Sequence, residues 1–274
     1  MPLLQFLQIP LGAALGILVA LAARRAGTLT QDGTWAAALL GAVVFGLGGW
    51  QWAVLLLAFF LSSSGLSRAF ATRKRTLSEK FSKGSRRDAA QVLANGGLAG
   101  AFVLAHLLRP EAVWPWLGFA GALAAVNADT WATELGVLSR ARPVLISSGK
   151  PVEKGTSGGV TPLGTLATLG GAALLGALAG ALSPAGGAWI LGSAATFGGV
   201  CGSLLDSLLG ATRQAIFYCP HCEKETEHHP LHTCGTPTRL RRGLPWLNND
   251  LVNLAASLTG AAVAVFLWSI MQSK

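Results

Sequence analysis

Three carboxylates, Asp129, Glu134 and Asp206, lie in stretches of sequence that are otherwise apolar enough to cross a lipid bilayer. An ionised carboxylate is costly in hydrocarbon, so such residues are rare unless they face a polar cavity, a metal ion or a substrate. Their neighbours include Asn, Thr, Ser and Gly, which are small or polar. This combination predicts a membrane protein with a buried reaction or transport site.

The first two carboxylates belong to one polar segment, residues 127–134. On a helix, Asn127, Thr130 and Glu134 share one face, and Asp129 lies on an adjacent stripe. Two carboxylates with hydroxyl and amide neighbours near the end of a span are suitable oxygen ligands for Mg²⁺. The alternative is a polar helix end that is solvated among lipid headgroups.

The third carboxylate, Asp206, lies in a glycine-rich segment. Gly199, Gly202 and Gly210 lie on the same helix face as this carboxylate. Glycine lets another helix approach closely, which turns Asp206 into the bundle and away from lipid. The alternative to a functional site is a structural hydrogen bond between helices.

A glycine-rich loop with two lysines precedes the helix that is expected to begin near residue 160. Glycines expose backbone N–H groups, the following helix N-terminus is electropositive, and lysines add full charges, so the loop suits phosphate. It lacks the Gly-Lys-Ser/Thr order of a Walker A motif, and an ordinary turn is the alternative. The candidate phosphate-binding residues are Lys150, Lys154, Gly155, Thr156, Ser157, Gly158 and Gly159.

Polar residues also begin two other expected spans. Arg86 and Arg87 lie just before one of them, where they suit either a phosphate or anionic lipid headgroups. In the last span, Asn249 and Asn253 follow i, i+4 spacing, so their amides point to the same side. Helix capping explains the first residues of that span but does not explain Asn253, one turn deeper.

A separate cluster of cysteines and histidines lies between the last two expected spans. A Cys-x-x-Cys knuckle followed by a further Cys and nearby His predicts a Cys₃His zinc site, which is favoured over a disulfide in a reducing loop. Four protein ligands leave no open position, so we expect the metal to fold the loop at residues 213–246. The expected ligands are Cys219, Cys222, His232 and Cys234, with His228 and His229 as substitutes for His232.

Membrane-spanning helices must position these residues. Of the 274 residues, 51% are hydrophobic and only 12% are charged, against about 25% charged in soluble domains. Because a crossing needs about 20 apolar residues, the sequence predicts a single all-α polytopic domain over residues 1–274 with seven to eight spans. The second and third spans are short and could instead form one long span or a re-entrant pair. The expected spans are 3–23, 34–48, 50–66, 89–108, 112–137, 160–182, 186–209 and 247–270.

The basic residues predict the orientation of the chain. Nineteen of the 21 lysines and arginines fall in four loops, at 24–25, 68–87, 140–154 and 213–242. Basic loops favour the cytoplasmic side, so eight crossings of the cell (inner) membrane with the N-terminus outside place all four loops in the cytoplasm. No basic stretch belongs to a recognisable nucleic-acid-binding module, so the expected partner is the lipid bilayer and not nucleic acid.

Five segments, taken in order, resemble an integral-membrane family long classed as a domain of unknown function. That family includes animal transmembrane protein nineteen and the phytyl-phosphate kinase of plants and cyanobacteria. Its members often have Asn where Ser157 stands here, which leaves the loop argument unchanged, and the zinc-type loop is not shared by every member. The segments that carry the resemblance are residues 86–96, 128–136, 155–160, 202–212 and 248–253.

The resemblance implies a Mg²⁺-dependent kinase that transfers a phosphoryl group from a nucleoside triphosphate, such as CTP, to a phytyl or prenyl monophosphate. Asp129, Glu134 and Asp206 would be the catalytic residues and would hold Mg²⁺. Phosphates would be bound by Lys150, Lys154, the Gly155–Gly159 loop, Arg86 and Arg87. The residues that would orient the substrates are Gln91, Asn95, Asn127, Asn249, Asp250 and Asn253.

Two other functions fit the same residues. In an ion-coupled transporter, the carboxylates would bind a cation at the membrane midplane. A cytidylyltransferase-like enzyme would use the same metal and CTP but would release pyrophosphate. Product analysis separates the enzymes, and substrate flux identifies a transporter.

Overall fold

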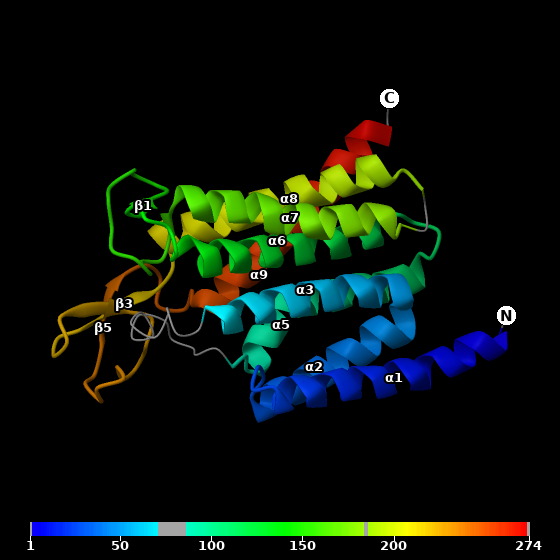
Figure 1. The fold of residues 1–274 in the computed structure, drawn as a ribbon, viewed down its shortest axis with the longest axis horizontal. Helices are drawn as coiled ribbons and strands as arrows, with labels where there is room; N and C mark the ends of the chain where they lie inside the picture. Colours follow the sequence, from blue (N-terminus) through cyan, green and yellow to red (C-terminus); the bar gives the residue numbers. More distant parts are fainter. Residues whose placement is uncertain (1, 71–85, 184–185, 273–274) are drawn as a thin grey trace.

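The chain folds as a bundle of antiparallel helices whose long connections gather at one end (Figure 1). The computed structural model describes residues 2–70, 86–183 and 186–272, with side chains from Leu7 onward. Each expected span coincides with one helix, which confirms the polytopic helical fold. The helices are α1 (Pro2–Arg25), α2 (Gln31–Val43), α3 (Trp50–Ala69), α5 (Ala89–Leu108), α6 (Trp114–Gly136), α7 (Pro162–Ala181), α8 (Ala188–Thr212) and α9 (Asn249–Gln272).

The second and third expected spans form two separate helices. Helix α2 continues as the short π-helix η1 (Val44–Gly48), and the chain then turns at Gly49, whose φ of 89° is in the region that favours glycine. Among the described residues, six helices are long and apolar enough to cross a membrane: α1, α3, α5, α7, α8 and α9. Helix α2 is only 13 residues long, and the polar segment of α6 lowers its hydropathy.

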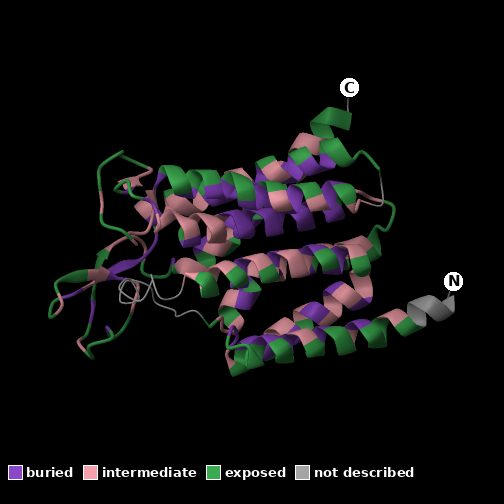
Figure 2. Cartoon of the chain, viewed as in Figure 1, coloured by how far each residue is buried: buried purple, intermediate pink, exposed green. Residues whose placement is uncertain are grey.

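Helix α6 is the centre of the bundle, and every residue from Pro115 to Ala128 is buried (Figure 2). It packs against α3, α5, α7, α8 and α9. Small residues make these contacts close, because a Cβ atom on Gly121 would lie only 2.4 Å from the carbonyl oxygen of Gly260 on α9. A helix that is surrounded in this way can carry polar side chains away from lipid.

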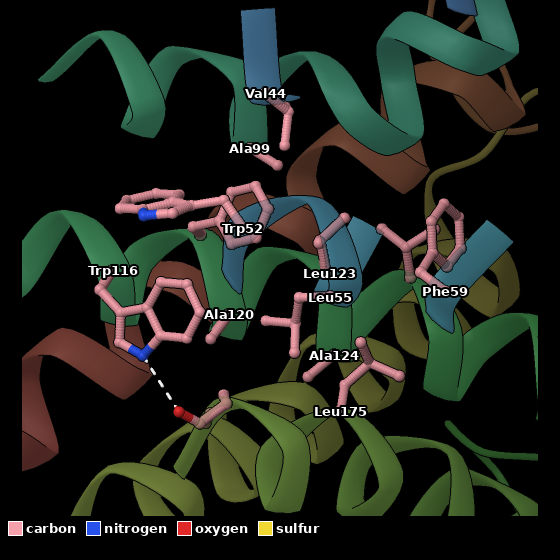
Figure 3. Packing of buried hydrophobic residues seen from close by; sticks show 14 of the residues in the cluster. Val44, Trp52, Leu55, Phe59, Ala99, Trp116, Ala120, Leu123, Ala124 and Leu175 are labelled. Atoms are coloured by element: carbon pink, nitrogen blue, oxygen red, sulfur yellow. Dashed lines mark hydrogen bonds between the residues drawn. The ribbon is translucent and has the colours of Figure 1, made fainter. Parts of the chain in front are cut away.

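The apolar core lies where α3, α5, α6 and α7 meet (Figure 3). Trp52 packs edge-on against Trp116 at 5.1 Å between ring centroids, and Trp116 Nε1 donates a hydrogen bond of 3.1 Å to the carbonyl oxygen of Ala179. Large apolar side chains such as Leu39 and Leu166 are instead exposed on the outside. That exposed apolar surface suits contact with lipid.

Two small sheets occupy the end of the bundle opposite the two termini (Figure 1). Strands β1 (Val144–Leu145) and β2 (Gly159–Val160) pair antiparallel in the loop before α7. Strands β3 (Ile216–Cys219), β4 (Lys224–Thr226) and β5 (Arg239–Arg242) form an antiparallel sheet in the order β4-β3-β5, between α8 and α9.

The basic loops lie at this same end. Residues 24–25, 140–154 and 213–242 are found there, as are Arg68, Arg86 and Arg87. The other basic residues of the loop at 68–87 fall within residues 71–85 and lie outside the described residues. The chain is therefore a multi-pass membrane protein in which the described basic residues other than Arg109 lie at one end, and the assignment of that end to the cytoplasm stays a prediction.

Candidate functional site

Two of the three intramembrane carboxylates meet at the basic end of the bundle. The carboxyl groups of Asp129 on α6 and Asp206 on α8 lie close enough to interact electrostatically, and Glu227 adds a third negative charge nearby. Asp206 Oδ2 is buried and makes no hydrogen bond of standard geometry to any described residue. Because carboxylates repel one another and a buried oxygen needs a partner, this arrangement suits a bound divalent cation.

Glycines bring the two helices close enough for this contact. A Cβ atom on Gly202 would lie 2.5 Å from the Cβ atom of Ala125, and one on Gly199 would lie 2.8 Å from that of Ala124. The glycine face expected from the sequence is thus the face by which α8 packs on α6. Asp206 lies one turn beyond Gly202 on the same face, so it points into the bundle.

The glycine loop packs directly on the last turn of α8. Gly158 has a φ of 80°, and a Cβ atom there would lie 2.2 Å from the backbone nitrogen of Ala211. Arg242 Nη1 donates a hydrogen bond of 2.8 Å to the carbonyl oxygen of Gly210, and its Nη2 donates one of 3.3 Å to that of Ser157. The loop and the carboxyl pair therefore share the same end of one helix.

A chain of side chains links this loop to the carboxyl pair. Ser157 Oγ donates to Gln214 Oε1 at 2.7 Å, and Gln214 Nε2 donates to Glu227 Oε1 at 2.8 Å. Gln214 is only 1% exposed. Glu227 in turn faces Asp206. Neither Gln214 nor Glu227 was expected from the sequence, because both lie among ordinary polar loop residues, and only the folded β3–β4–β5 sheet brings them here.

The two lysines of the loop have different surroundings. Lys154 Nζ donates hydrogen bonds to the carbonyl oxygens of Val137 and Ser139, at 3.1 and 2.7 Å, and so caps the end of α6. Lys150 lies at an exposed turn. Gly155 also has a positive φ, of 77°, and Thr156 and Gly159 close tight backbone turns.

Glu134 belongs to a second polar group, on another face of α6. It is 6% exposed and accepts a hydrogen bond of 2.7 Å from Ser67 Oγ on α3. Arg87 lies near it, with its guanidinium 5.6 Å from the ring centroid of Phe59. Burial lowers the pKa of Arg87 to about 10, and the charge of Glu134 opposes this shift. Arg86 is exposed and donates to the carbonyl oxygen of Leu29.

A largely apolar cavity opens from Arg87 between α1, α2, α3 and α5. Gln91 and Asn95 also line it, and Asn95 Oδ1 is buried without a hydrogen-bond partner among the described residues. Gln91 additionally forms a capping box with Asp88 at the start of α5. The cavity thus has an apolar interior, and its polar lining consists of the guanidinium of Arg87 and the amides of Gln91 and Asn95.

Asn127 has a packing role in the structure. It is 0% exposed, accepts hydrogen bonds from Ser62 and Ser63 on α3, and donates one of 2.8 Å to the carbonyl oxygen of Gly171 on α7. These bonds join three helices. The side chain that was expected to orient a substrate is therefore already hydrogen-bonded to two neighbouring helices.

The polar start of α9 lies at the same end of the bundle. Asn249, Asp250 and Asn253 are half-buried in its first turns. The substrate-orienting role of Asn249, Asp250 and Asn253 stays a prediction. Asn248 is the residue that caps the helix, through a bond of 3.0 Å from the backbone nitrogen of Leu251.

The cysteine and histidine cluster assembles as expected. The ligand atoms of Cys219, Cys222, His232 and Cys234 all lie within 4.8 Å of one another. Hydrogen bonds from Thr236 and His232 lower the pKa of Cys234 to about 5, which favours the thiolate. His229 instead stacks on Phe217, at 4.3 Å between ring centroids. The structure therefore selects His232 among the three histidines.

The chain is similar to a family of integral membrane proteins. The family model described as "Integral membrane protein DUF92" matches residues 14–261, and the chain belongs to this family. The chain is 33% identical to "Protein PGR" of Arabidopsis thaliana over 232 residues, which is 77% of this chain and 79% of that protein.

Uncharacterized membrane proteins are also similar to the chain. The one from Methanocaldococcus jannaschii is 30% identical over 250 residues, covering 91% of this chain and 90% of the relative. One from Synechocystis is 27% identical over 239 residues, covering 86% and 81%. No solved structure is detectably similar to the chain.

Proposed function

We propose that the protein is a membrane kinase that transfers a phosphoryl group from a nucleoside triphosphate to an isoprenoid monophosphate. The observation that carries this proposal is the Asp129–Asp206 carboxyl pair beside the glycine loop on the end of α8. A cation site next to a phosphate-binding loop is what phosphoryl transfer requires, since that reaction depends on positioning and charge neutralisation.

The residues present fit Mg²⁺. Asp129 and Asp206 offer oxygen ligands from two helices, and Glu227 is placed to add a third carboxylate. When bound, the ion would neutralise charge on the β- and γ-phosphates. Glu134, which contacts Ser67 and faces Arg87, is better placed to hold that arginine than to share this cation.

The nucleotide phosphates would lie along the glycine loop. Its backbone, from Gly155 to Gly159, is held against α8 by Gly158 and Arg242, and Lys150 stands exposed beside it. Lys154 would contribute positive charge from its position at the end of α6. CTP is the donor that the family resemblance implies.

The acceptor would lie between Arg87 and the apolar cavity. A prenyl chain is apolar and suits the cavity interior, whereas its phosphate suits Arg87 at the boundary. Asn95 lines the same cavity, and its side-chain NH₂ group would donate a hydrogen bond to the isoprenyl monophosphate. In this arrangement Glu134 keeps the guanidinium of Arg87 oriented toward the phosphate-binding end.

The reaction balances without an additional base. An oxygen of the acceptor monophosphate, already ionised at neutral pH, attacks the γ-phosphorus of the triphosphate. The new P–O bond forms while the bond to the β-phosphate oxygen breaks, which releases a nucleoside diphosphate and an isoprenyl diphosphate. The protein supplies orientation and positive charge.

The direct test is incubation of the purified, detergent-solubilised protein with Mg²⁺, each nucleoside triphosphate and a panel of isoprenyl monophosphates. We expect a nucleoside diphosphate and the isoprenyl diphosphate in equal amounts. Release of pyrophosphate would identify a nucleotidyl transferase. Substrate flux in proteoliposomes without nucleotide turnover would identify a transporter and overturn the kinase proposal.

A further inference from the structure

The sheet formed by β3, β4 and β5 is too small to be held by its own apolar contacts. Phe217 is buried on β3 against His229, but most of β5 is exposed. Folded units of this size usually need a metal or disulfides. The four residues Cys219, Cys222, His232 and Cys234 meet at one edge of it.

The distances between these residues match a tetrahedral metal site. Zinc–sulfur bonds of about 2.3 Å place two ligand sulfurs about 3.8 Å apart in a tetrahedron. The sulfurs of Cys219 and Cys234 are 3.6 Å apart, and His232 Nδ1 lies 3.3 Å from the Cys234 sulfur. A disulfide would bring two sulfurs to about 2.05 Å, so the cluster is not a bonded pair.

The same sheet supplies two groups to the end of the bundle. Glu227 follows β4 directly and bonds Gln214 beside the carboxyl pair, and Arg242 ends β5 and bonds the carbonyl oxygens of Gly210 and Ser157. Strand β3 lies between them and carries Cys219 at its end. A metal that fixes this sheet therefore also fixes Glu227 and Arg242.

We propose that Cys219, Cys222, His232 and Cys234 bind one structural Zn²⁺ ion, which folds the β3–β4–β5 sheet and holds Glu227 and Arg242 against the end of α8. Four protein ligands fill the tetrahedral shell, so the ion has no open position for substrate. The zinc site does not depend on the proposed kinase activity. A failure of either claim leaves the other to stand or fall on its own test.

The first experiment measures metal in the full-length protein, purified in detergent with reductant and without chelator. Elemental analysis should give one zinc per chain, and replacement by Co²⁺ should give thiolate-to-cobalt absorption. Cys222→Ser and His232→Ala should lose the bound zinc. Cys201→Ser is the matched control, because Cys201 lies on α8 outside the cluster, and this variant should keep the zinc.

The second experiment tests whether the ion holds the sheet. Trypsin should cut the wild-type protein slowly after the exposed residues Lys224, Arg239 and Arg241, and much faster after a strong chelator has removed zinc. Because it uses wild-type protein, this measurement remains informative if Cys222→Ser does not fold. Zinc well below one per chain in wild-type protein, or cleavage that does not change when zinc is removed, would overturn the proposal.

Discussion

Asp129 on α6 and Asp206 on α8 hold their carboxyl groups within electrostatic interaction distance across a helix interface made close by Gly199 and Gly202. Two carboxylates at such a distance repel unless a proton or a cation lies between them. A bound Mg²⁺ ion would relieve the repulsion between these two carboxylates.

Replacing Asp206 by Asn should separate function from folding. The amide keeps the shape of the side chain but removes the charge, so turnover should fall by about 100-fold or more, corresponding to about 3 kcal/mol of lost charge stabilisation. The unfolding temperature in metal-free detergent should stay equal or rise, because the like charges no longer repel. Both quantities can be measured on the same purified sample.

Glu111→Gln provides the matched control for this change. Glu111 lies in the connection between α5 and α6, at the opposite end of the bundle, and is exposed. Its loss should alter neither turnover nor unfolding. If Asp206→Asn retains full activity at every Mg²⁺ concentration, Asp206 does not belong to a catalytic metal site.

Much of this arrangement could be predicted from the sequence because helices have a fixed period. The glycine face of α8 and the position of Asp206 on it follow from residue spacing. The sequence also predicted Glu134 as a metal ligand together with Asp129, and in the structure Glu134 accepts a hydrogen bond from Ser67 and lies near Arg87. Residue spacing along a helix does not predict which neighbouring helix will pack against each of its faces.

Loop residues could not be predicted in the same way. Glu227 and Gln214 reach the carboxyl pair only through the fold of a sheet whose strand pairing has no periodic signal in so short a segment. Lys154 was expected from its charge, but its bonds to the carbonyl groups of Val137 and Ser139, just after α6, follow from local geometry. The sequence motif therefore predicted that a lysine is present in this loop, but only the structure shows which atoms that lysine contacts.

The close packing of the glycine loop on α8 predicts a graded response to added methyl groups. Gly158→Ala places a Cβ atom 2.2 Å from Ala211 N at a φ of 80°, so the loop must move. We expect a loss of about 1 to 3 kcal/mol in stability and a raised KM for the nucleotide. Differential scanning fluorimetry and nucleotide titration measure the two effects.

Gly149→Ala isolates the backbone contribution. Gly149 also has a positive φ, of 65°, but nothing lies within 4 Å of an added Cβ atom. This variant should lose only about 1 kcal/mol and should leave the nucleotide KM unchanged. Equal effects on KM from both variants would show that the packing of Gly158 on α8 does not position the nucleotide.

The hydrogen bonds of Asn127 predict that it matters for stability more than for substrate binding. Asn127→Ala removes bonds to α3 and α7 and leaves the buried hydroxyl of Ser63 without its acceptor, whereas the half-buried Ser62 keeps the carbonyl oxygen of Phe59. The expected loss is about 1 to 3 kcal/mol, with unchanged KM values for both substrates. Ser64→Ala is the control, because Ser64 Oγ has no hydrogen-bond partner among the described residues. A selective rise in one KM would restore the substrate-orienting role.

Adjacent arginines should differ in their effect on the acceptor. Arg87 lies over the rings of Phe59 and Phe60 beside Glu134, whereas Arg86 is exposed. Arg87→Lys should raise the KM for the isoprenyl monophosphate about tenfold, since lysine cannot bind phosphate through two parallel N–H groups or stack on a ring. Arg86→Lys should leave it unchanged. Equal effects would place the acceptor phosphate elsewhere.

If the protein is the proposed kinase, the cavity next to Arg87 predicts how the length of the prenyl chain affects binding of the acceptor. Ala37 lines the cavity from α2, and a phenylalanine there would fill part of its apolar interior, whereas Leu39 on the same helix is 66% exposed to the outside. If the prenyl chain lies in the cavity, Ala37→Phe should weaken binding of long-chain acceptors by about tenfold or more while sparing short-chain ones. Leu39→Phe should change neither, and nucleotide KM values should be unaffected in both variants. Competition assays with acceptors of increasing length measure this directly. A uniform loss across all chain lengths would instead mean that the tail lies in the surrounding lipid and that only Arg87 and its neighbours hold the headgroup.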